Sequence, residues 1–165
     1  MAFSQHTIFG GALVAVIFVA SIAGIAVTGG PGEARKQRED TARLNALSAT
    51  AQALACYQQA IGDIPEDLSI VEEELSHAIS DARQQDGCTM VALQNDPVTD
   101  APFRLQRQDG AVTHICADFA TSSDGNPYGV YSYGLAGAVI PALNDARDAP
   151  GEHCFEVNLQ GKLEP

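Results

Sequence analysis

The chain has 165 residues, a formal net charge of −12 and a pI near 4.4. This length suits one domain rather than two. The excess of acidic residues disfavours a nucleic-acid binder, which needs Lys and Arg for the phosphates, and a domain lying on anionic lipid. It suits a well-solvated domain or an electropositive protein partner.

An uncharged, almost continuously apolar segment lies near the N-terminus, between Ile8 and Val27. Roughly 20 helical residues cross the ~30 Å hydrocarbon core of a bilayer. The pattern predicts one transmembrane helix at about 8–28, within an anchor of residues 1–30. The alternative is a cleaved signal peptide, but its apolar part is only about 7–15 residues long and follows basic residues. Because no Lys or Arg precedes Ile8, we favour a retained anchor.

Prepilin processing is a third possibility for this segment. It needs a basic leader, a Gly–aromatic junction and a Glu a few residues into the helix. Phe9 and Gly10 stand in the opposite order and no Glu follows, so we reject it.

Small residues recur at four-residue intervals along the anchor, as Gly11 and Ala15, and as Ala20, Gly24 and Thr28. Small side chains let a second transmembrane helix approach closely. We expect this face to pack against an intramembrane partner, although Gly and Ala are also common in membrane spans generally.

Four cysteines, Cys56, Cys88, Cys116 and Cys154, lie beyond the anchor. An even number on an exported domain indicates two disulfides, with three possible pairings. Free buried thiols and a zinc site are the alternatives. Zinc is disfavoured because its ligands usually come in close pairs such as C-x-x-C, and none is present.

The orientation of the anchor is contested by two signals. Arg35, Lys36, Arg38 and Arg43 follow the apolar segment, and the positive-inside rule would therefore keep the domain in the cytoplasm. The cysteines favour an oxidising compartment. We expect residues 31–165 to form an exported domain in the periplasm of a bacterium with a single-pass inner-membrane anchor.

A long helix is predicted from about residues 31–33 to Gly62, with Pro65 just beyond it. Its apolar stripe consists of Leu44, Leu47, Ala51, Leu54 and Ile61. The charged residues of its first turns are expected to form a solvated face with i,i+4 pairs from Arg35 to Glu39 and from Glu39 to Arg43. A partner's docking site is the alternative for this face.

A second helix is predicted to open at residues 65–67, whose acidic side chains oppose the helix dipole. Its buried side is expected to consist of Leu68, Val71, Leu75, Ala78, Ile79 and Ala82. Consecutive helical residues point in different directions. Residues 72–74, all Glu, are therefore read as a solvated face rather than a catalytic carboxylate pair.

The second half of the domain carries strand and turn signals. A Pro-bounded turn at 96–102 precedes an alternating strand at 103–107, an Asp-Gly hairpin turn and a return strand at 112–119. The last strand is placed at 154–159. An irregular insertion at about 122–150 contains the candidate partner-contact residues Tyr128, Tyr131, Tyr133 and Leu135, and an apolar run at 139–143 that is expected to pack on the domain or a partner. The predicted fold class is α+β, with a long amphipathic helix packed on a small antiparallel sheet.

Four segments in this order resemble a loosely defined group of small bacterial single-pass proteins with a pseudopilin-like (type IV pilin-like) periplasmic domain. Residues 30–43 are similar to a G-S-P-x-x-x-R and D-x-x-R helix start, and residues 60–68 to A-I-x-x-G-x-L-P-x-x-L. Residues 96–103 are similar to D-P-x-T-G-x-P-Y, and residues 115–121, closed by 151–155, to L-C-A-T-F-A-T.

The resemblance implies a pilin-like fold and a disulfide between Cys116 and Cys154. Cys56 would then be left to pair with Cys88, a bridge that the group itself does not imply. The sequence departs from the group at Asp100, which replaces the usual turn Gly, and in its longer insertion. The group has no settled activity, so it conveys fold more than function.

No catalytic set is recognisable in the sequence. Ser122-Ser123-Asp124 has no identifiable His partner, and His77 and His114 are isolated. Asp118, Asp124 and Asn126 have oxygens suited to Ca²⁺, but their spacing matches no dedicated motif and favours turn chemistry. We therefore expect neither an enzyme, nor a metal or other cofactor, nor a small-molecule substrate.

The expected function is that of a non-enzymatic accessory subunit. Its anchor in the lipid bilayer and its periplasmic domain would dock onto and stabilise a larger integral membrane protein complex of the inner membrane, respiratory or photosynthetic. The alternative is a pseudopilin-type subunit of a secretion or pilus machine. The absent processing site and helix Glu count against that alternative.

Overall fold

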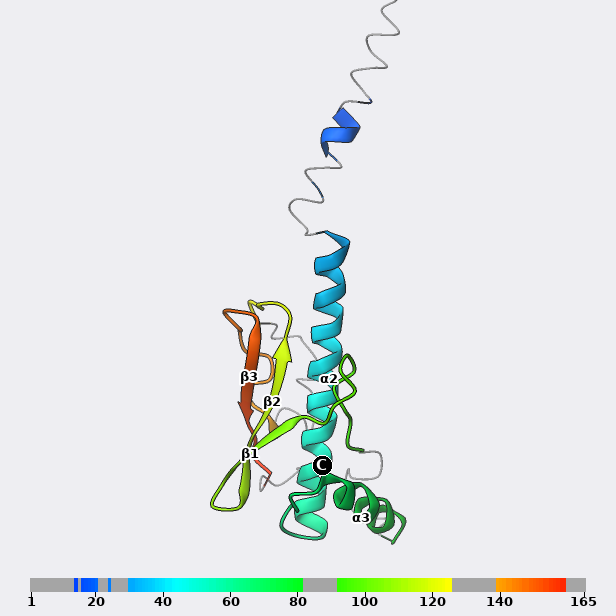
Figure 1. The fold of residues 1–165 in the computed structure, drawn as a ribbon, viewed down its shortest axis with the longest axis vertical. Coiled ribbons are helices and arrows are strands. Elements are labelled where there is room, and N and C mark those ends of the chain that lie inside the picture. The colour runs from blue at the N-terminus through cyan, green and yellow to red at the C-terminus, as the bar shows by residue number, and fades with distance from the viewer. Residues whose placement is uncertain are drawn as a thin grey trace, which may run out of the picture. The chain divides into compact units, whose positions relative to one another are not determined.

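A computed structural model describes Val14, residues 16–20, Gly24, and residues 30–81, 92–125 and 139–159 (Figure 1). The chain divides into two compact units, residues 1–36 and 37–165. The described elements are two helices, α2 and α3, followed by three strands, β1 to β3. The α+β class and the long helix with a small antiparallel sheet are confirmed.

The described residues of the first unit that precede Gly30 are helical, and their large apolar side chains are exposed. The exposed fractions of Val14, Val16, Ile17, Phe18 and Val19 are 57–67%. Within the part of the chain that the structure describes, no helix combines the length and the apolar character of a membrane span. Most of the predicted span at 8–28, with Gly11, Ala15 and Thr28, lies outside that part.

Helix α2 (Pro31–Ala60) begins and ends as its sequence predicts. The amide of Glu33 donates to Gly30 O at 2.9 Å, and Pro31 tolerates the first turn because its missing N–H needs no partner there. At the other end the amides of Ile61 and Gly62 both donate to Tyr57 O, and Gly62 has a φ of 129°. A positive φ strains residues with a Cβ, so Gly is suited to end the helix.

The predicted stripe of α2 is correct in its centre and wrong at its end. Leu47, Ala51 and Leu54 are fully buried, and Leu44 packs against them. Ile61, however, is 43% exposed. It lies one residue beyond the last helical residue, where the turn at Gly62 carries its side chain away from the core.

Helix α3 (Leu68–Asp81) starts slightly later than predicted, after the N-cap Asp67, whose carboxylate accepts the Ser69 amide at 3.0 Å. Val71 and Leu75 are buried as expected. The side chains of Ala78 and Ile79, and the residue Ala82, lie outside the described part.

The sheet is antiparallel in the order β1-β2-β3, formed by β1 (Arg104–Gln108), β2 (Ala111–Phe119) and β3 (Gly151–Glu156). Asp109 and Gly110 have φ values of 52° and 85° in the hairpin turn, as the Asp-Gly pair predicts. The predicted last strand at 154–159 is displaced: β3 begins at Gly151, because residues 151–153 continue the pairing opposite 117–119.

A disulfide joins Cys116 of β2 to Cys154 of β3, directly opposite each other in the register. The pairing that the resemblance implies is therefore confirmed. Cys56 is also disulfide-bonded. Its expected partner, Cys88, lies outside the described residues.

One hydrophobic core joins α2 to the sheet and to the described end of the insertion. Leu47 and Leu54 of α2 and Ile115 of β2 are completely buried in it. Val139, Ile140 and Leu143 join the same core, which confirms that this run packs on the domain. Tyr128, Tyr131, Tyr133 and Leu135 lie outside the described residues.

Candidate functional site

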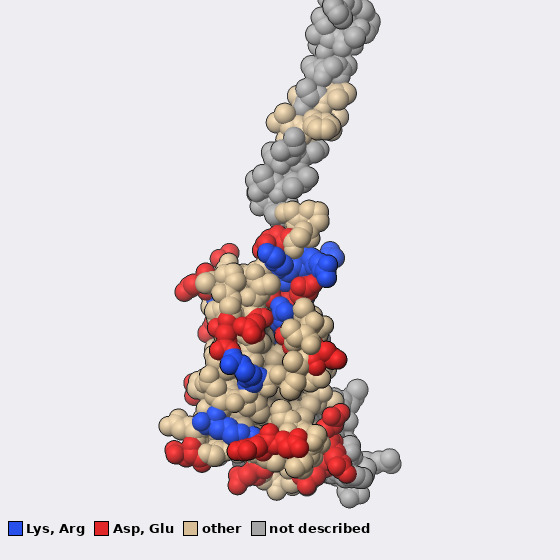
Figure 2. All heavy atoms as spheres, in the orientation of Figure 1, with Lys and Arg blue, Asp and Glu red and all other residues tan. Residues whose placement is uncertain are grey.

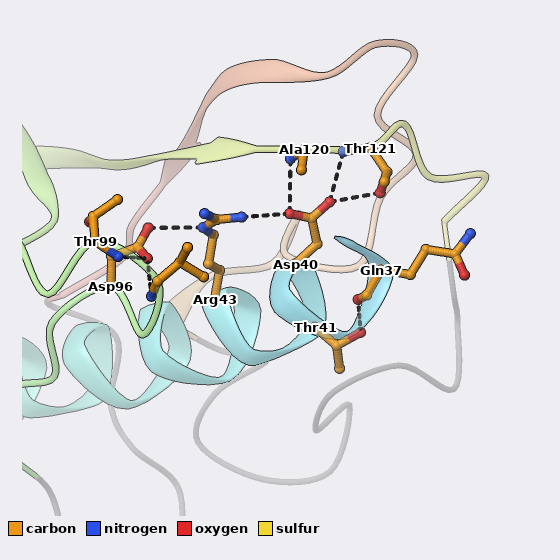
Figure 3. A network of polar contacts seen from close by, with 9 residues as sticks. Gln37, Asp40, Thr41, Arg43, Asp96, Thr99, Ala120 and Thr121 are labelled. Carbon is orange, nitrogen blue, oxygen red and sulfur yellow. Dashed lines mark hydrogen bonds and ion pairs between the residues drawn. The ribbon is translucent and has the colours of Figure 1, made fainter. Parts of the chain in front are cut away.

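Asp40 of α2 is the centre of a buried polar network that fastens the helix to the chain leaving β2 (Figure 3). Its Oδ1 accepts the Ala120 amide at 2.9 Å and Arg43 Nη1 at 2.8 Å. Its Oδ2 accepts the amide and the hydroxyl of Thr121 at 2.8 and 2.7 Å. Both carboxylate oxygens are therefore satisfied, as a buried charge requires.

Arg43 connects this carboxylate to a second one. Its Nε donates to Asp96 Oδ2 at 2.9 Å, while Nη1 pairs with Asp40, so one guanidinium lies between two carboxylates. Asp96 precedes β1, and Figure 3 shows the three charged side chains in a row along α2. The row ties the helix to both ends of the β1–β2 hairpin.

Asp96 also organises its own turn. Its Oδ1 accepts the amides of Val98 and Thr99 at 2.7 and 3.2 Å, and its backbone O accepts the amide of Asp100 at 2.8 Å. Asp and Asn favour such turns because their side chains bond backbone amides two residues on. Asp100, at the end of this turn, has a φ of 57°.

The network favours the charged forms of Asp96 and Arg43. Burial opposes ionisation of Asp96, but hydrogen bonds from Val98, Arg43 and Thr99 outweigh it and lower its pKa. Burial likewise disfavours charge on Arg43, but hydrogen bonds and attraction from Asp96 and then Asp40 raise its pKa. Asp96 and Arg43 are therefore held as a buried ion pair.

This network corrects the predicted solvated charge face at two positions, while Arg35, Lys36 and Arg38 are exposed as predicted. Asp40 is 2% exposed and Arg43 is 6% exposed, and Arg43 forms ion pairs with Asp40 and Asp96. A signal was present in the sequence: 40, 43, 47, 51 and 54 follow one helical stripe, so the polar pair continues the apolar face toward the N-terminus. No such pattern indicated that Asp96, 53 residues from Arg43, would join the network.

A hollow of about 580 Å³ lies beside Asp40 and is lined by Thr121, Ser123, Asp124, Leu143 and Arg147, among others. We refer to it as the Arg147 hollow. The backbones of Ser123 and Arg147 pair across it at 2.7 and 2.8 Å.

Arg147 itself is 5% exposed, and its guanidinium lies 4.1 Å from the centre of the Phe119 ring. Among the described residues, its Nε has no hydrogen-bond acceptor. Burial lowers the pKa of Arg147, and the charge of Asp40 partly offsets that effect. The cation is held by the aromatic face and by the field of Asp40, while Asp124 and Asp145 make the lining of the hollow acidic.

A second hollow, of about 730 Å³, lies between the start of α3, residues 92–95 and β1. We call it the α3 groove. Half-buried Leu68, Leu93 and Leu105 give it an apolar floor, while Glu66, Asp67 and Glu72 stand on its rim.

The other predicted site residues are dispersed. Asp118 is exposed on β2 and Asp124 lines the Arg147 hollow, while Asn126 lies outside the described residues. Among the described residues, no three His, Cys, Asp or Glu side chains are grouped to hold a metal ion. His114 is half-buried and contacts the Thr113 hydroxyl at 3.1 Å. The side chain of His77 is not described.

Glu74 differs from the prediction of a purely solvated Glu72–Glu74 face. It accepts a hydrogen bond from the hydroxyl of Tyr57, and this bond raises the pKa of Tyr57 to about 12, with burial and the charge of Glu74 adding to it. Glu74 therefore links α3 to the buried end of α2.

Comparison with protein families, with characterised proteins and with solved structures yields no significant match to this chain.

Proposed function

We propose that this protein is a non-enzymatic, single-pass accessory subunit that docks onto a larger complex of the bacterial inner membrane, respiratory or photosynthetic, and stabilises it. Its domain would lie in the periplasm. The observation that carries the proposal is the apolar surface of the described N-terminal residues. Val16, Phe18 and Val19 are each 67% exposed in the chain alone, and side chains of this kind need lipid or a protein partner to cover them.

The disulfides support the periplasmic location. Cys116 is bonded to Cys154, and Cys56 is also oxidised. Stable disulfides are typical of exported domains and rare in a reducing cytoplasm. They oppose the positive-inside signal of Arg35, Lys36 and Arg38, which are exposed on the first turns of α2.

The chemistry of the buried network supports a structural role over a catalytic one. Asp40, Arg43 and Asp96 are buried, and their hydrogen bonds go to other groups of the domain. A catalytic acid or base must reach a substrate proton. These three instead hold the helix on the sheet.

The fold also supports a second candidate function, that of a pseudopilin-type subunit of a secretion or pilus machine. The 30-residue α2 packs on an antiparallel three-stranded sheet whose last two strands share a disulfide. This helix-on-sheet arrangement is the pilin-like feature of the domain. It would be the assembly unit of such a machine.

The test is isolation of the tagged full-length protein in a mild detergent, followed by native electrophoresis and mass spectrometry. We expect a stoichiometric complex with integral respiratory or photosynthetic subunits. Secretion or pilus components in its place would establish the second candidate. A protein that migrates alone at every detergent concentration would contradict both.

A separate experiment tests the location. A reporter that is active only outside the cytoplasm, fused after Pro165, should be active. Activity of a cytoplasm-dependent reporter at the same position would overturn the periplasmic assignment and support the positive-inside rule.

A further inference from the structure

Hydrogen bonds hold each wall of the α3 groove in place, so its shape exists before any partner binds. Thr50 of α2 and Gln94 exchange two hydrogen bonds at 3.0 Å, which fix the wall at residues 92–95. Arg107 of β1 donates to the backbone oxygens of Ile64 and Pro65 at 2.7 and 2.6 Å, which fixes the link between the helices. A preformed groove has little ordering cost on binding.

The start of α3 forms the third wall. Asp67 accepts both the amide and the hydroxyl of Ser69, at 3.0 and 2.7 Å, and so holds the first turn in place. These hydrogen bonds lower the pKa of Asp67, which keeps its carboxylate charged. Glu66 and Glu72 are exposed beside it.

The floor and the rim of the groove differ in chemistry. The floor exposes parts of Leu68, Leu93 and Leu105 above the buried ring of Phe103. The rim has three carboxylates and one cation, Arg107, whose guanidinium is already bonded to the helix link. Figure 2 shows acidic side chains gathered at the end of the domain that carries α3.

From this combination we infer that the α3 groove is a docking site for a segment of a partner protein in which apolar side chains are flanked by Lys or Arg. The apolar side chains enter between Leu68, Leu93 and Leu105, and the basic ones face Glu66, Asp67 and Glu72. Charge complementarity selects a basic segment, because an acidic segment would be repelled by the carboxylates of the rim. The inference rests on the proposed docking function and names the surface that performs it.

The test uses the full-length protein in nanodiscs of zwitterionic lipid and three short fluorescent peptides. In the first, Leu residues are flanked by Lys; in the second, Glu replaces each Lys; in the third, Ser replaces each Leu. Fluorescence anisotropy measures the affinity of each. We expect the first peptide to bind most tightly, because only it satisfies both floor and rim.

Two charge-reversal variants locate the binding. Glu66→Lys/Glu72→Lys changes the rim, and Asp118→Lys/Glu156→Lys makes the same change of net charge on exposed sheet positions outside the groove. We expect about a tenfold loss of affinity for the first peptide in the rim variant and little change in the sheet variant. Equal losses in the two variants would mean diffuse attraction to an acidic protein and would overturn the inference.

A photo-crosslinking residue at position 69, on the rim, should capture the first peptide, whereas one at position 118 should not. Capture at position 118 alone would also contradict binding of the peptide in the groove.

Native isolation separates this inference from the proposed function. If the rim variant still joins the large complex in full yield, the docking function stands and the groove is not its surface. If the peptide results hold but no complex is found, the groove stands and the accessory-subunit function is wrong.

Discussion

Asp40 shows how one buried charge can determine where a helix lies. Four hydrogen bonds reach its carboxylate, from Arg43, Ala120 and Thr121. Apolar contacts are non-directional and hold α2 against the sheet without selecting its register, while hydrogen bonds to a single carboxylate admit one position only. The network therefore supplies specificity, and its free energy becomes visible when one member is removed.

Asp40→Ala should lower the free energy of unfolding by about 3–5 kcal/mol, because it leaves Arg43 Nη1 and the amides of Ala120 and Thr121 without their acceptor. Glu33→Ala is the matched control, since Glu33 forms a surface ion pair with Lys36 at 3.7 Å. That variant should change stability by less than about 1 kcal/mol. Denaturant unfolding of the full-length protein in detergent measures both. Equal effects would contradict a structural role for the network.

The raised pKa of Tyr57 predicts that the protein becomes less stable at alkaline pH. Its folded pKa of about 12 lies above the ordinary value of 10.0, so the protonated hydroxyl is favoured by folding. The stabilisation is complete below pH 10 and is lost as pH rises through 12. Tyr57→Phe should destabilise the protein by on the order of 2 kcal/mol at pH 8, with a smaller difference at pH 11. A difference that does not depend on pH would contradict the role of the Glu74 hydrogen bond.

Asp100 occupies a left-handed position with a φ of 57°. Glycine adopts this conformation without strain, so Asp100→Gly should stabilise the protein by up to about 1 kcal/mol. Thr99→Gly is the control, because the φ of Thr99 is not positive. Glycine there adds freedom to the unfolded chain and removes the hydroxyl that accepts the Ala101 amide at 3.4 Å, with an expected loss of about 0.5–1 kcal/mol. Thermal unfolding measures both. Destabilisation by Asp100→Gly would show that the Asp side chain has a role of its own.

At the scale of elements, the strands are joined by more than their hydrogen bonds. The disulfide between β2 and β3 closes 38 residues of sequence that include the irregular insertion. β3 has no close turn to fix its register, unlike the β1–β2 hairpin with its Asp-Gly pair. The disulfide and the buried Phe155 therefore fix the register of β3, as the Asp-Gly turn fixes the register of β1.

Cys116→Ala/Cys154→Ser should lower the free energy of unfolding by roughly 3–4 kcal/mol, as expected for a closed loop of this length. The folded variant should still form the α2 core, so only its stability should fall. Denaturant unfolding with circular dichroism measures both quantities. A loss below about 1 kcal/mol would show that packing alone holds β3 in register.

For the whole molecule, the described N-terminal residues and the domain differ in their surfaces. The described residues before Gly30 expose Val, Ile and Phe, whereas the charged side chains that Figure 2 shows on the domain are more often acidic than basic. Such a division suits the proposed docking subunit, in which the apolar segment meets lipid or protein and the acidic domain meets electropositive partners.

Gly24→Leu tests the intramembrane contact. Apart from its own helix backbone, no described atom lies within 4 Å of a Cβ placed at Gly24, so the substitution meets no obstacle in the described part of the chain. If a partner helix packs on this face, the variant should lower recovery of the complex severalfold. Val19→Leu, an apolar change at an already large and exposed residue, is the control. Unchanged recovery with Gly24→Leu would remove the predicted helix-packing face.

The sequence alone determined the features that depend on neighbouring residues: the start and end of α2, the apolar stripe at Leu47, Ala51 and Leu54, and the Asp-Gly hairpin turn. These follow from local propensity and periodicity. The resemblance added the Cys116–Cys154 pairing. The early start of β3 was missed because its first residues carry no strand pattern and are paired only through contact with β2.

Only the tertiary structure decided the roles of Asp40, Arg43 and Asp96. By composition they belong to a solvated helix face and a turn, and charged residues are mostly exposed. They are buried here because residues distant in sequence, Ala120 and Thr121 among them, supply enough hydrogen bonds to offset the loss of water. The α3 groove arises in the same way, since its floor and rim come from segments that only the fold brings together.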